Sequence, residues 1–379
     1  MKTPATGAVC SSSVYHMKTF TCQCGATLYF ENTRCLACDR KLGFLPDELK
    51  ISALEPSGSA WNALANDKTY RMCNNYAAED VCNWMVPIDD ANEYCLACRL
   101  NQTIPNLNEP KNRILWFRME AAKRWLFYML LRLNLPITDR QQDPQRGLAF
   151  QFLADTASDQ SISSEEYREV VTGHHSGCIT INLSEADHSS REEMREKMSE
   201  HYRTLLGHFR HEIGHYYWML LIDNRHWLDQ YRDIFGDERT SYDESLQRYY
   251  QQGPVADWES SFISAYASAH PWEDWAETWA HYLHMLDTLE TAHDHGFALH
   301  GQSVAPPPIA RDDSRQLGHF FSASLASFDN LIRDWSNLTL AMNALNRSMG
   351  LPDAYPFVLT GAVTEKLRFV HRVIQDVAS

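Results

Sequence analysis

Residues 202–218 read YRTLLGHFRHEIGHYYW and contain the pentapeptide His211-Glu212-Ile213-Gly214-His215. On a helix, side chains four residues apart lie one above the other, so His211 and His215 can present two imidazole nitrogens to one metal ion. Glu212 then projects beside the metal, where a base is needed to take a proton from a metal-bound water. The pattern predicts a metal-binding helix. The alternative is a polar helix face whose histidines are satisfied by carboxylates or water.

The start of this helix is predicted from the preceding segment. Ser190-Arg191-Glu192-Glu193 is a capping box, with serine at the cap and glutamate three residues later. We expect a helix that begins there and either runs to about Ile222 or restarts near Ser199. An apolar flank that would bury the helix is supplied by Leu205, Leu206, Phe209, Ile213, Tyr216 and Tyr217.

A catalytic zinc ion takes three protein ligands and leaves the fourth position open. The metzincin pattern is excluded, because Trp218 and Leu221 stand where it requires glycine and histidine. A downstream cysteine is also excluded, since no cysteine follows Cys178. A carboxylate or a distant histidine therefore has to complete the set.

The best candidate stretch is residues 269–284, which read AHPWEDWAETWAHYLH. Pro271 is favoured in a first helical turn, so a helix is expected to start there. One face of that helix would carry Glu273, Glu277, His281 and His284. We predict Glu273 as the third ligand and Glu277 as the acceptor that holds the far nitrogen of a zinc-bound histidine.

Two alternatives stay open at this stage. Glu277 could be the ligand in place of Glu273, and the face could be a solvated acidic surface. His281 and His284 are expected to support the ligands or to face the substrate. A donor to the transition-state oxyanion could come from Tyr266, His270 or His281, which the sequence does not rank.

Nine of the ten cysteines fall in the first hundred residues, which points to metal sites. The first set is Cys22, Cys24, Cys35 and Cys38, around a short strand expected at residues 26–30; the second is Cys73, Cys82, Cys95 and Cys98. Each set offers four thiols for a structural zinc ion. Ligands shared between the sets, or a single ion, are the alternatives. Cys10 is expected to be a free thiol.

Charge limits the partners. The chain of 379 residues has a formal net charge of −15, and residues 1–109 hold 9 Lys and Arg against 12 Asp and Glu. Binding to nucleic acid or to an anionic membrane is therefore disfavoured, and the cysteine-rich module is expected to contact protein, if it has a partner. No secretory signal or membrane span is indicated, so a cytoplasmic location is expected.

The rest of the chain supplies a scaffold. A linker is expected at residues 101–111, a long buried helix at 113–133, and strands at 147–152 and 178–183. The second strand could be an edge against which an extended peptide lies, and His174 and His175 before it are expected to be turn residues. A hinge at residues 305–308 would lead to helices at 315–347 and 362–377.

Several of these stretches together resemble one family. They are residues 20–25, 82–84, 95–100, 179–183, 209–218 and 271–277. The chain resembles bacterial zinc-binding metallopeptidases that carry an N-terminal zinc-ribbon domain. The Glu273-x-x-Ala276-Glu277 arrangement is similar to the ligand helix of gluzincins. The resemblance implies zinc at His211, His215 and Glu273, with Glu212 catalytic.

The predicted fold class is α+β and mainly α. A zinc-ribbon module with its linker is expected at residues 1–110, and a zincin-like metallopeptidase domain at residues 111–379. The predicted activity is hydrolysis of a peptide bond in a peptide or protein, with one catalytic zinc ion and one or two structural ones. The alternative is a zinc-binding adaptor that binds a protein partner and does no chemistry.

Overall fold

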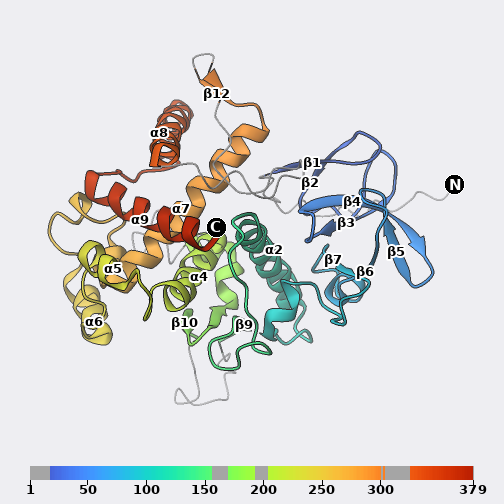
Figure 1. Ribbon diagram of the computed structural model, residues 1–379, viewed down its shortest axis with the longest axis horizontal. Coiled ribbons are helices and arrows are strands. Elements are labelled where there is room, and N and C mark those ends of the chain that lie inside the picture. The colour runs from blue at the N-terminus through green and yellow to red at the C-terminus, as the bar shows by residue number, and fades with distance from the viewer. Residues whose placement is uncertain (1–17, 156–169, 193–203, 300–301, 304–324, 379) are drawn as a thin grey trace.

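The structure is a computed structural model that describes residues 18–155, 170–192, 204–299, 302–303 and 325–378. A cysteine-rich β module is followed by a mainly helical part, which confirms the predicted fold class (Figure 1). The predicted hinge at residues 305–308 and Cys10 lie outside the described residues. Among the described helices, none combines the length and apolar character that crossing a membrane requires.

The N-terminal module is built from two antiparallel sheets. A two-stranded ribbon pairs β1 (Thr19–Thr21) with β2 (Thr27–Tyr29), and β2 lies within the strand predicted at residues 26–30. The second sheet has five strands in chain order: β3 (Lys41–Leu45), β4 (Lys50–Ser57), β5 (Ala60–Ala63), β6 (Thr69–Met72) and β7 (Met85–Pro87). A bridge between Phe44 and Trp84 joins the first strand to the chain just before the last, so the sheet curls around a buried aromatic core.

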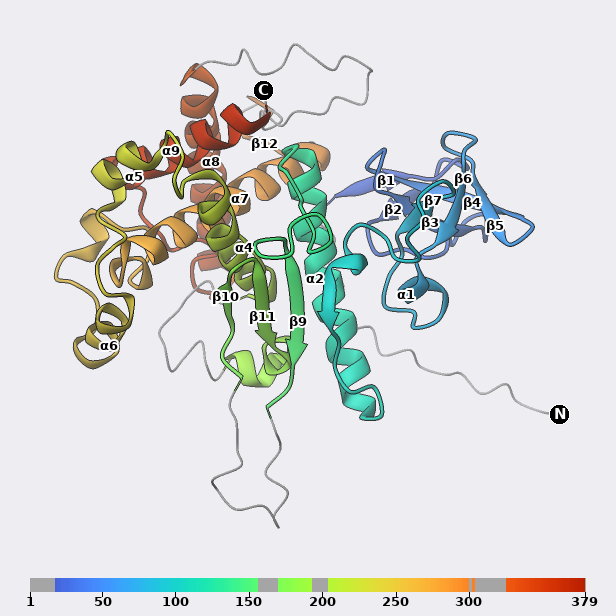
Figure 2. The same cartoon turned by 60° about the horizontal axis from the view of Figure 1, so that its bottom comes forward.

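Helix α2 (Pro110–Arg132) lies between this module and the rest of the chain (Figure 2). It begins three residues before the predicted start, because Pro110, which we assigned to the linker, is suited to the first helical turn. The helix is buried on both sides. Phe30 of the module packs on Trp125 with ring centroids 4.1 Å apart, and Arg124 forms an ion pair with Glu31.

A four-stranded mixed sheet packs beyond α2. Its order is β10 (Gly173–His175), β11 (Cys178–Asn182), β9 (Ala149–Leu153) and β8 (Asn101–Thr103). The predicted linker is therefore partly wrong, since residues 101–103 form a strand parallel to β9. The predicted edge strand is also wrong: β11 is internal, because a tight turn at Ser176 and Gly177, both with positive φ, folds β10 back along it. Among the described strands, β10 forms the edge on this side.

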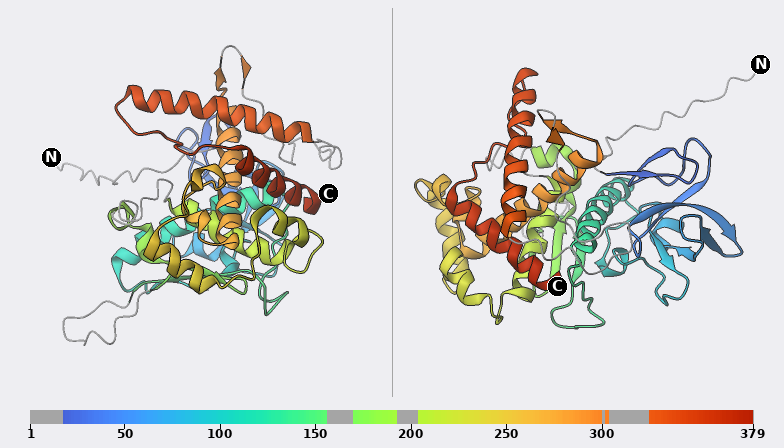
Figure 3. Two further views of the ribbon diagram at one scale, coloured as in Figure 1. Left: turned by 90° about the vertical axis from the view of Figure 1, so that its left-hand side faces the viewer. Right: turned by 45° about the horizontal axis from the view of Figure 1, so that its top comes forward.

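Six longer helices complete the described fold. They are α4 (Leu205–Leu221), α5 (Leu228–Phe235), α6 (Tyr242–Gln252), α7 (Pro271–Asp294), α8 (Leu325–Ser348) and α9 (Gly361–Ala378). Helix α7 crosses α4 and is in turn contacted by α8 and α9 (Figure 3). The remaining described elements are short: α1 (Asn74–Ala77), η1 (Cys98–Leu100), η2 (Leu183–Ala186), η3 (Trp258–Ser260), η4 (Tyr266–Ser268), β12 (Ala298–Leu299) and β13 (Gln302–Ser303).

The predicted start of the motif helix is wrong. Residues 188–192 are already helical, and the Asp187 side chain accepts a hydrogen bond from the Ser189 amide at 3.0 Å, so the helix begins ahead of Ser190. The motif helix α4 has a separate start. Thr204 is extended and its hydroxyl accepts a hydrogen bond from the Gly207 amide at 2.9 Å, which places the first turn at Leu205.

Candidate metal centre

The site lies where α4 crosses α7, and a glycine makes the crossing close. A Cβ on Gly214 would lie 3.1 Å from the Cα of Ala276 and 3.2 Å from the Cβ of Trp279, so a larger residue would push the helices apart. The Trp275 indole donates a hydrogen bond of 2.8 Å to the Gly214 carbonyl. These contacts fix how the two helices face each other.

Three donor atoms converge at this crossing. His211 Nε2 lies 3.2 Å from His215 Nε2, and Glu273 Oε2 lies 3.0 Å from His211 Nε2 and 3.6 Å from His215 Nε2. With bonds of about 2.0 Å from a tetrahedral zinc ion to nitrogen and oxygen, neighbouring ligand atoms are about 3.3 Å apart. The three side chains therefore fit three corners of a zinc tetrahedron. No other described side chain of a ligand type joins them, which leaves one corner for a non-protein ligand.

A carboxylate and a hydroxyl hold His211. Glu277 Oε1 lies 2.6 Å from His211 Nδ1, which is the contact expected of an acceptor for the far nitrogen of a ligand histidine. The Ser264 hydroxyl donates a hydrogen bond of 2.7 Å to the other oxygen, Glu277 Oε2. Burial alone would lower the pKa of His211, but the two carboxylates of Glu273 and Glu277 together raise it well above its usual range.

A tyrosine holds the third candidate ligand. The Tyr242 hydroxyl donates a hydrogen bond of 2.7 Å to Glu273 Oε1, which leaves Oε2 directed at the two histidines. Neither Tyr242 nor Ser264 was predicted from the sequence. Both come from segments without a motif, α6 and the chain before η4, and only the folded arrangement brings them to the site.

Glu212 lies beside the donor set. Its side chain is buried, with 7% of the residue exposed. Burial raises the pKa of Glu212, and the charge of Glu273 raises it further, while the histidines around it act in the opposite direction. A buried carboxylate with a raised pKa is suited to accepting a proton and giving it back.

The three oxyanion candidates have different surroundings. His270 is the cap of α7: its Nδ1 accepts a hydrogen bond from the Trp272 amide and its Nε2 lies 3.2 Å from the Thr240 carbonyl, so both nitrogens are occupied. His281 is buried, and its Nδ1 lies 2.9 Å from the Tyr355 hydroxyl. Only Tyr266 stands against a metal-ligand candidate, with its ring 6.0 Å from that of His211.

The prediction that His174 and His175 are turn residues is wrong, because both lie in strand β10 and the turn follows at Ser176 and Gly177. His174 instead binds this turn with its side chain. Its Nε2 accepts a hydrogen bond from the Gly177 amide at 3.0 Å, and burial lowers the pKa of His174 to about 3. The ring is nearly parallel to that of His215, with centroids 6.3 Å apart. Edge strand β10 therefore lies next to the donor set. His284, the last residue of the predicted polar face, is half-buried; its Nδ1 lies 3.4 Å from Arg210 Nη1, and its ring packs on Trp335 and Tyr355.

The eight cysteines separate into the two predicted sets, with no sharing between them. Sulfur atoms within the sets lie 3.8 Å (Cys22 and Cys38), 3.7 Å (Cys24 and Cys35) and 3.9 Å (Cys82 and Cys95) apart. A tetrahedral zinc ion with bonds of about 2.3 Å to sulfur separates its ligand atoms by about 3.8 Å. Both sets thus fit a closed tetrahedral site rather than disulfides.

The two cysteine sets differ in their surroundings. In the outer set Cys24 is exposed, and Leu36, which directly follows Cys35, is 97% exposed. In the inner set all four cysteines are buried, and Cys98 Sγ lies 3.7 Å from Glu120 Oε2 of α2. Glu120 also receives hydrogen bonds from Asn101 and the Trp116 indole. The inner set is therefore continuous with the interior of the helical part.

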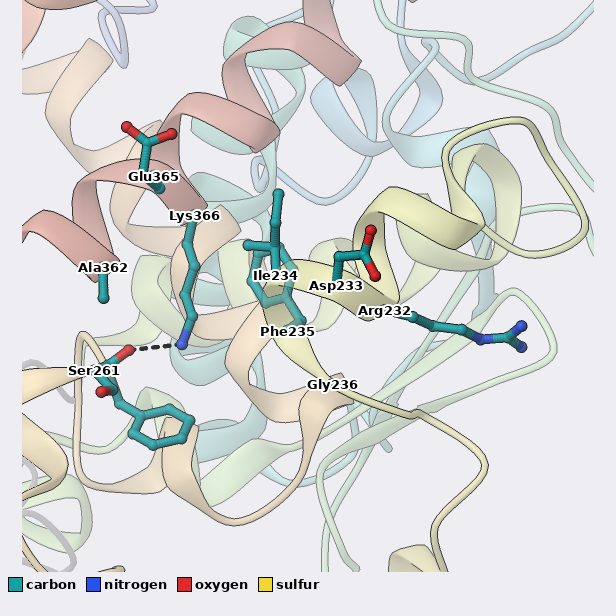
Figure 4. Close-up of a pocket in the computed structure, with 10 residues that line it drawn as sticks. Arg232, Asp233, Ile234, Phe235, Gly236, Ser261, Ala362, Glu365 and Lys366 are labelled. Carbon is teal, nitrogen blue, oxygen red and sulfur yellow. Dashed lines mark hydrogen bonds between the residues drawn. The ribbon is translucent and has the colours of Figure 1, made fainter.

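A cavity of about 430 Å³ lies apart from the donor set, between the end of α5, the loop after η3 and the start of α9 (Figure 4). Its lining includes Phe235, Gly236, Ser261 and Lys366, and none of the candidate ligands.

The family profile described as "Putative zinc-binding metallo-peptidase" matches residues 112–373, and that of a zinc-ribbon domain matches residues 19–109. Two mycobacterial proteins titled uncharacterized, Rv2568c of Mycobacterium tuberculosis and Mb2598c of Mycobacterium bovis, are each 41% identical to the chain over 364 residues, or 96% of both sequences. No solved structure matches significantly. The chain therefore belongs to the zinc-binding metallopeptidase family, with a zinc-ribbon domain ahead of its metallopeptidase domain.

Proposed function

We propose that this protein hydrolyses peptide bonds with a zinc ion held by His211, His215 and Glu273 and with Glu212 as the general base. The proposal is supported mainly by the set of three donor atoms at tetrahedral spacing and by the buried Glu212 carboxylate beside it. Three protein ligands and a base are the parts of a catalytic zinc site, whereas a structural site is closed by a fourth protein ligand. A third ligand from Glu273-x-x-Ala276-Glu277, on a later helix, supports assignment to the gluzincin type.

The chemistry divides between the ion and the side chains. A zinc ion bound there would polarise the scissile carbonyl and lower the pKa of a coordinated water toward neutrality. Glu212 accepts the proton of the attacking water and passes it to the leaving amine, which its raised pKa favours. The Tyr266 hydroxyl is our candidate donor to the oxyanion, because of the three candidates it is the one beside His211.

The substrate is expected to bind in extended form along β10. An edge strand offers unpaired backbone groups to a peptide, which can add to the sheet through main-chain hydrogen bonds. The neighbouring position of His174 and His215 supports this choice, since a peptide on β10 would pass close to the donor set. We also propose one structural zinc ion in each cysteine set, which gives three zinc ions per chain.

The test compares wild type with Glu212→Gln, which keeps the shape of the side chain and removes its basicity. We expect both proteins to hold three equivalents of zinc, and the variant to cleave a denatured protein or a peptide library about 10²- to 10⁴-fold more slowly. Equal cleavage by the two proteins would contradict the proposal. Zinc binding without cleavage by either protein would favour the alternative function, a zinc-binding adaptor that does no chemistry.

A further inference from the structure

One lysine of the C-terminal helix α9 is buried against α7, the helix that carries Glu273. Lys366 of α9 is 6% exposed, and its Nζ lies 2.6 Å from Asp274 Oδ2 in the first turn of α7. Asp274 is completely buried and directly follows Glu273. A buried carboxylate is costly without a cation beside it, so the pair fixes the position of this turn relative to α9.

The same ammonium group also holds a second segment. Lys366 Nζ donates a hydrogen bond of 2.6 Å to the Ser261 carbonyl, which is the contact drawn in Figure 4. It also lies 4.2 Å from the centroid of the Phe262 ring, so two successive residues of this segment bind it. A further hydrogen bond of 3.0 Å, from Thr360 to the Ser260 carbonyl, joins the residue before α9 to the same segment.

Both segments end at the donor set. The first turn of α7 carries Glu273, and the segment that begins at Ser260 continues to Ser264, whose hydroxyl binds Glu277. Glu277 in turn binds His211. A single buried cation therefore connects to the ligand set by two routes, one through the helix backbone and one through a hydrogen-bonded pair.

We propose that Lys366 is a positioning residue of the metal centre, whose ammonium group sets the relative placement of Glu273 and of the Ser264–Glu277 pair. The proposal rests on the proposed function, because it takes Glu273 to be a ligand. The C-terminal helix is then part of the scaffold that determines metal affinity, although it supplies no ligand. Lys366 is also one of the residues that line the cavity in Figure 4.

The test measures metal affinity and stability in the full-length protein. Cobalt is added in place of zinc, because its absorption spectrum distinguishes a site with nitrogen and oxygen ligands from a site with four sulfurs. Lys366→Met removes the charge and keeps a long side chain. Val370→Ala is the matched control: Val370 is also completely buried in α9, and its truncation loosens the helix without touching the ion pair.

We expect Lys366→Met to weaken cobalt binding at the nitrogen and oxygen site about 10-fold, with the cysteine-site spectrum unchanged. Val370→Ala should lower the melting temperature and leave that affinity at the wild-type value. Unchanged affinity in Lys366→Met, or equal weakening in the two variants, would overturn the proposal. If Lys366→Met does not fold, Asp274→Asn replaces it, since the amide keeps the shape; it should weaken binding in the same direction, and wild-type affinity would overturn the proposal.

Glu273→Ala separates this proposal from the proposed function. Loss of the nitrogen and oxygen site in Glu273→Ala together with wild-type affinity in Lys366→Met would refute the role of Lys366 alone. Retention of that site in Glu273→Ala would refute the ligand assignment, and the positioning proposal with it.

Discussion

The zinc-ribbon module and the crossing of α4 with α7 both hold candidate metal ligands at tetrahedral spacing. The two regions differ in the number of protein donors per site, which is four in the module and three at the crossing. In the module, the four sulfurs of each set lie within 4.8 Å of one another, and contacts of 3.7 to 3.9 Å match the edges of a zinc tetrahedron. At the helix crossing, three atoms have the matching spacings for nitrogen and oxygen, and a buried carboxylate stands beside them. The comparison teaches that the number of protein donors, more than their spacing, separates a closed site from a reactive one.

A second difference lies within the module itself. In the outer cysteine set Cys24 is exposed and Cys38 is half-buried, while the inner set is buried throughout and touches Glu120 of α2. Because α2 packs against both the module and α4, the inner set stabilises the connection between the two parts of the chain. The outer set stabilises mainly its own ribbon.

The largest expected effect concerns the open site, which is the set of three donors from His211, His215 and Glu273. Glu273→Ala should lose one of three zinc equivalents and all measurable cleavage, because two histidines alone bind zinc weakly. Glu277→Ala should keep the third equivalent, with affinity reduced about 10- to 100-fold. Zinc content and cleavage of a peptide library check both variants. If Glu277→Ala loses the ion and Glu273→Ala keeps it, the two residues exchange roles.

The next effect sharpens the comparison of the two cysteine sets. Cys98→Ser should destabilise the protein by more than about 4 kcal/mol, because it opens a buried metal site next to α2. Cys24→Ser removes a ligand of the exposed set and should lower the free energy of unfolding by clearly less. Thermal unfolding followed in the helical part measures the difference. Equal effects on the helical part would show that the inner set has no special connection to α2.

The smallest effect concerns the hydrogen bond to the third ligand. Tyr242→Phe removes the donor to Glu273 Oε1 and should weaken zinc binding at the open site by about 10-fold, or about 1.4 kcal/mol. Tyr250→Phe, on the same helix with an exposed side chain, is the control and should bind zinc as the wild type does. Titration with a competing chelator gives the two affinities. Identical values would remove Tyr242 from the site.

The parts that local spacing determines could be predicted from the sequence. Helical periodicity places His211 and His215 on one face. Pro271 marks the start of the later helix, and the spacing of the cysteines along the chain indicates the two sets. The contact of Glu277 with His211 was also foreseen, since Glu277 stands one turn beyond Glu273.

The parts that depend on tertiary arrangement could not be predicted. Strand β10 becomes the edge only because a two-residue turn folds it onto β11. Thr204 replaces Ser190 as the cap of the motif helix, although both residue types suit a cap. Tyr242 and Ser264 reach the site from separate segments, Lys366 contacts the residues next to it, and no spacing in the chain relates the three to the motif.

The most direct test of the central claim is a crystal structure with anomalous difference maps recorded on both sides of the zinc absorption edge. The account predicts three zinc peaks, two of them each surrounded by four sulfurs. The third should lie between His211 Nε2, His215 Nε2 and Glu273 Oε2, with a water or another small ligand at its fourth corner. A zinc ion there with four protein ligands, or no zinc peak between these atoms, would contradict the account.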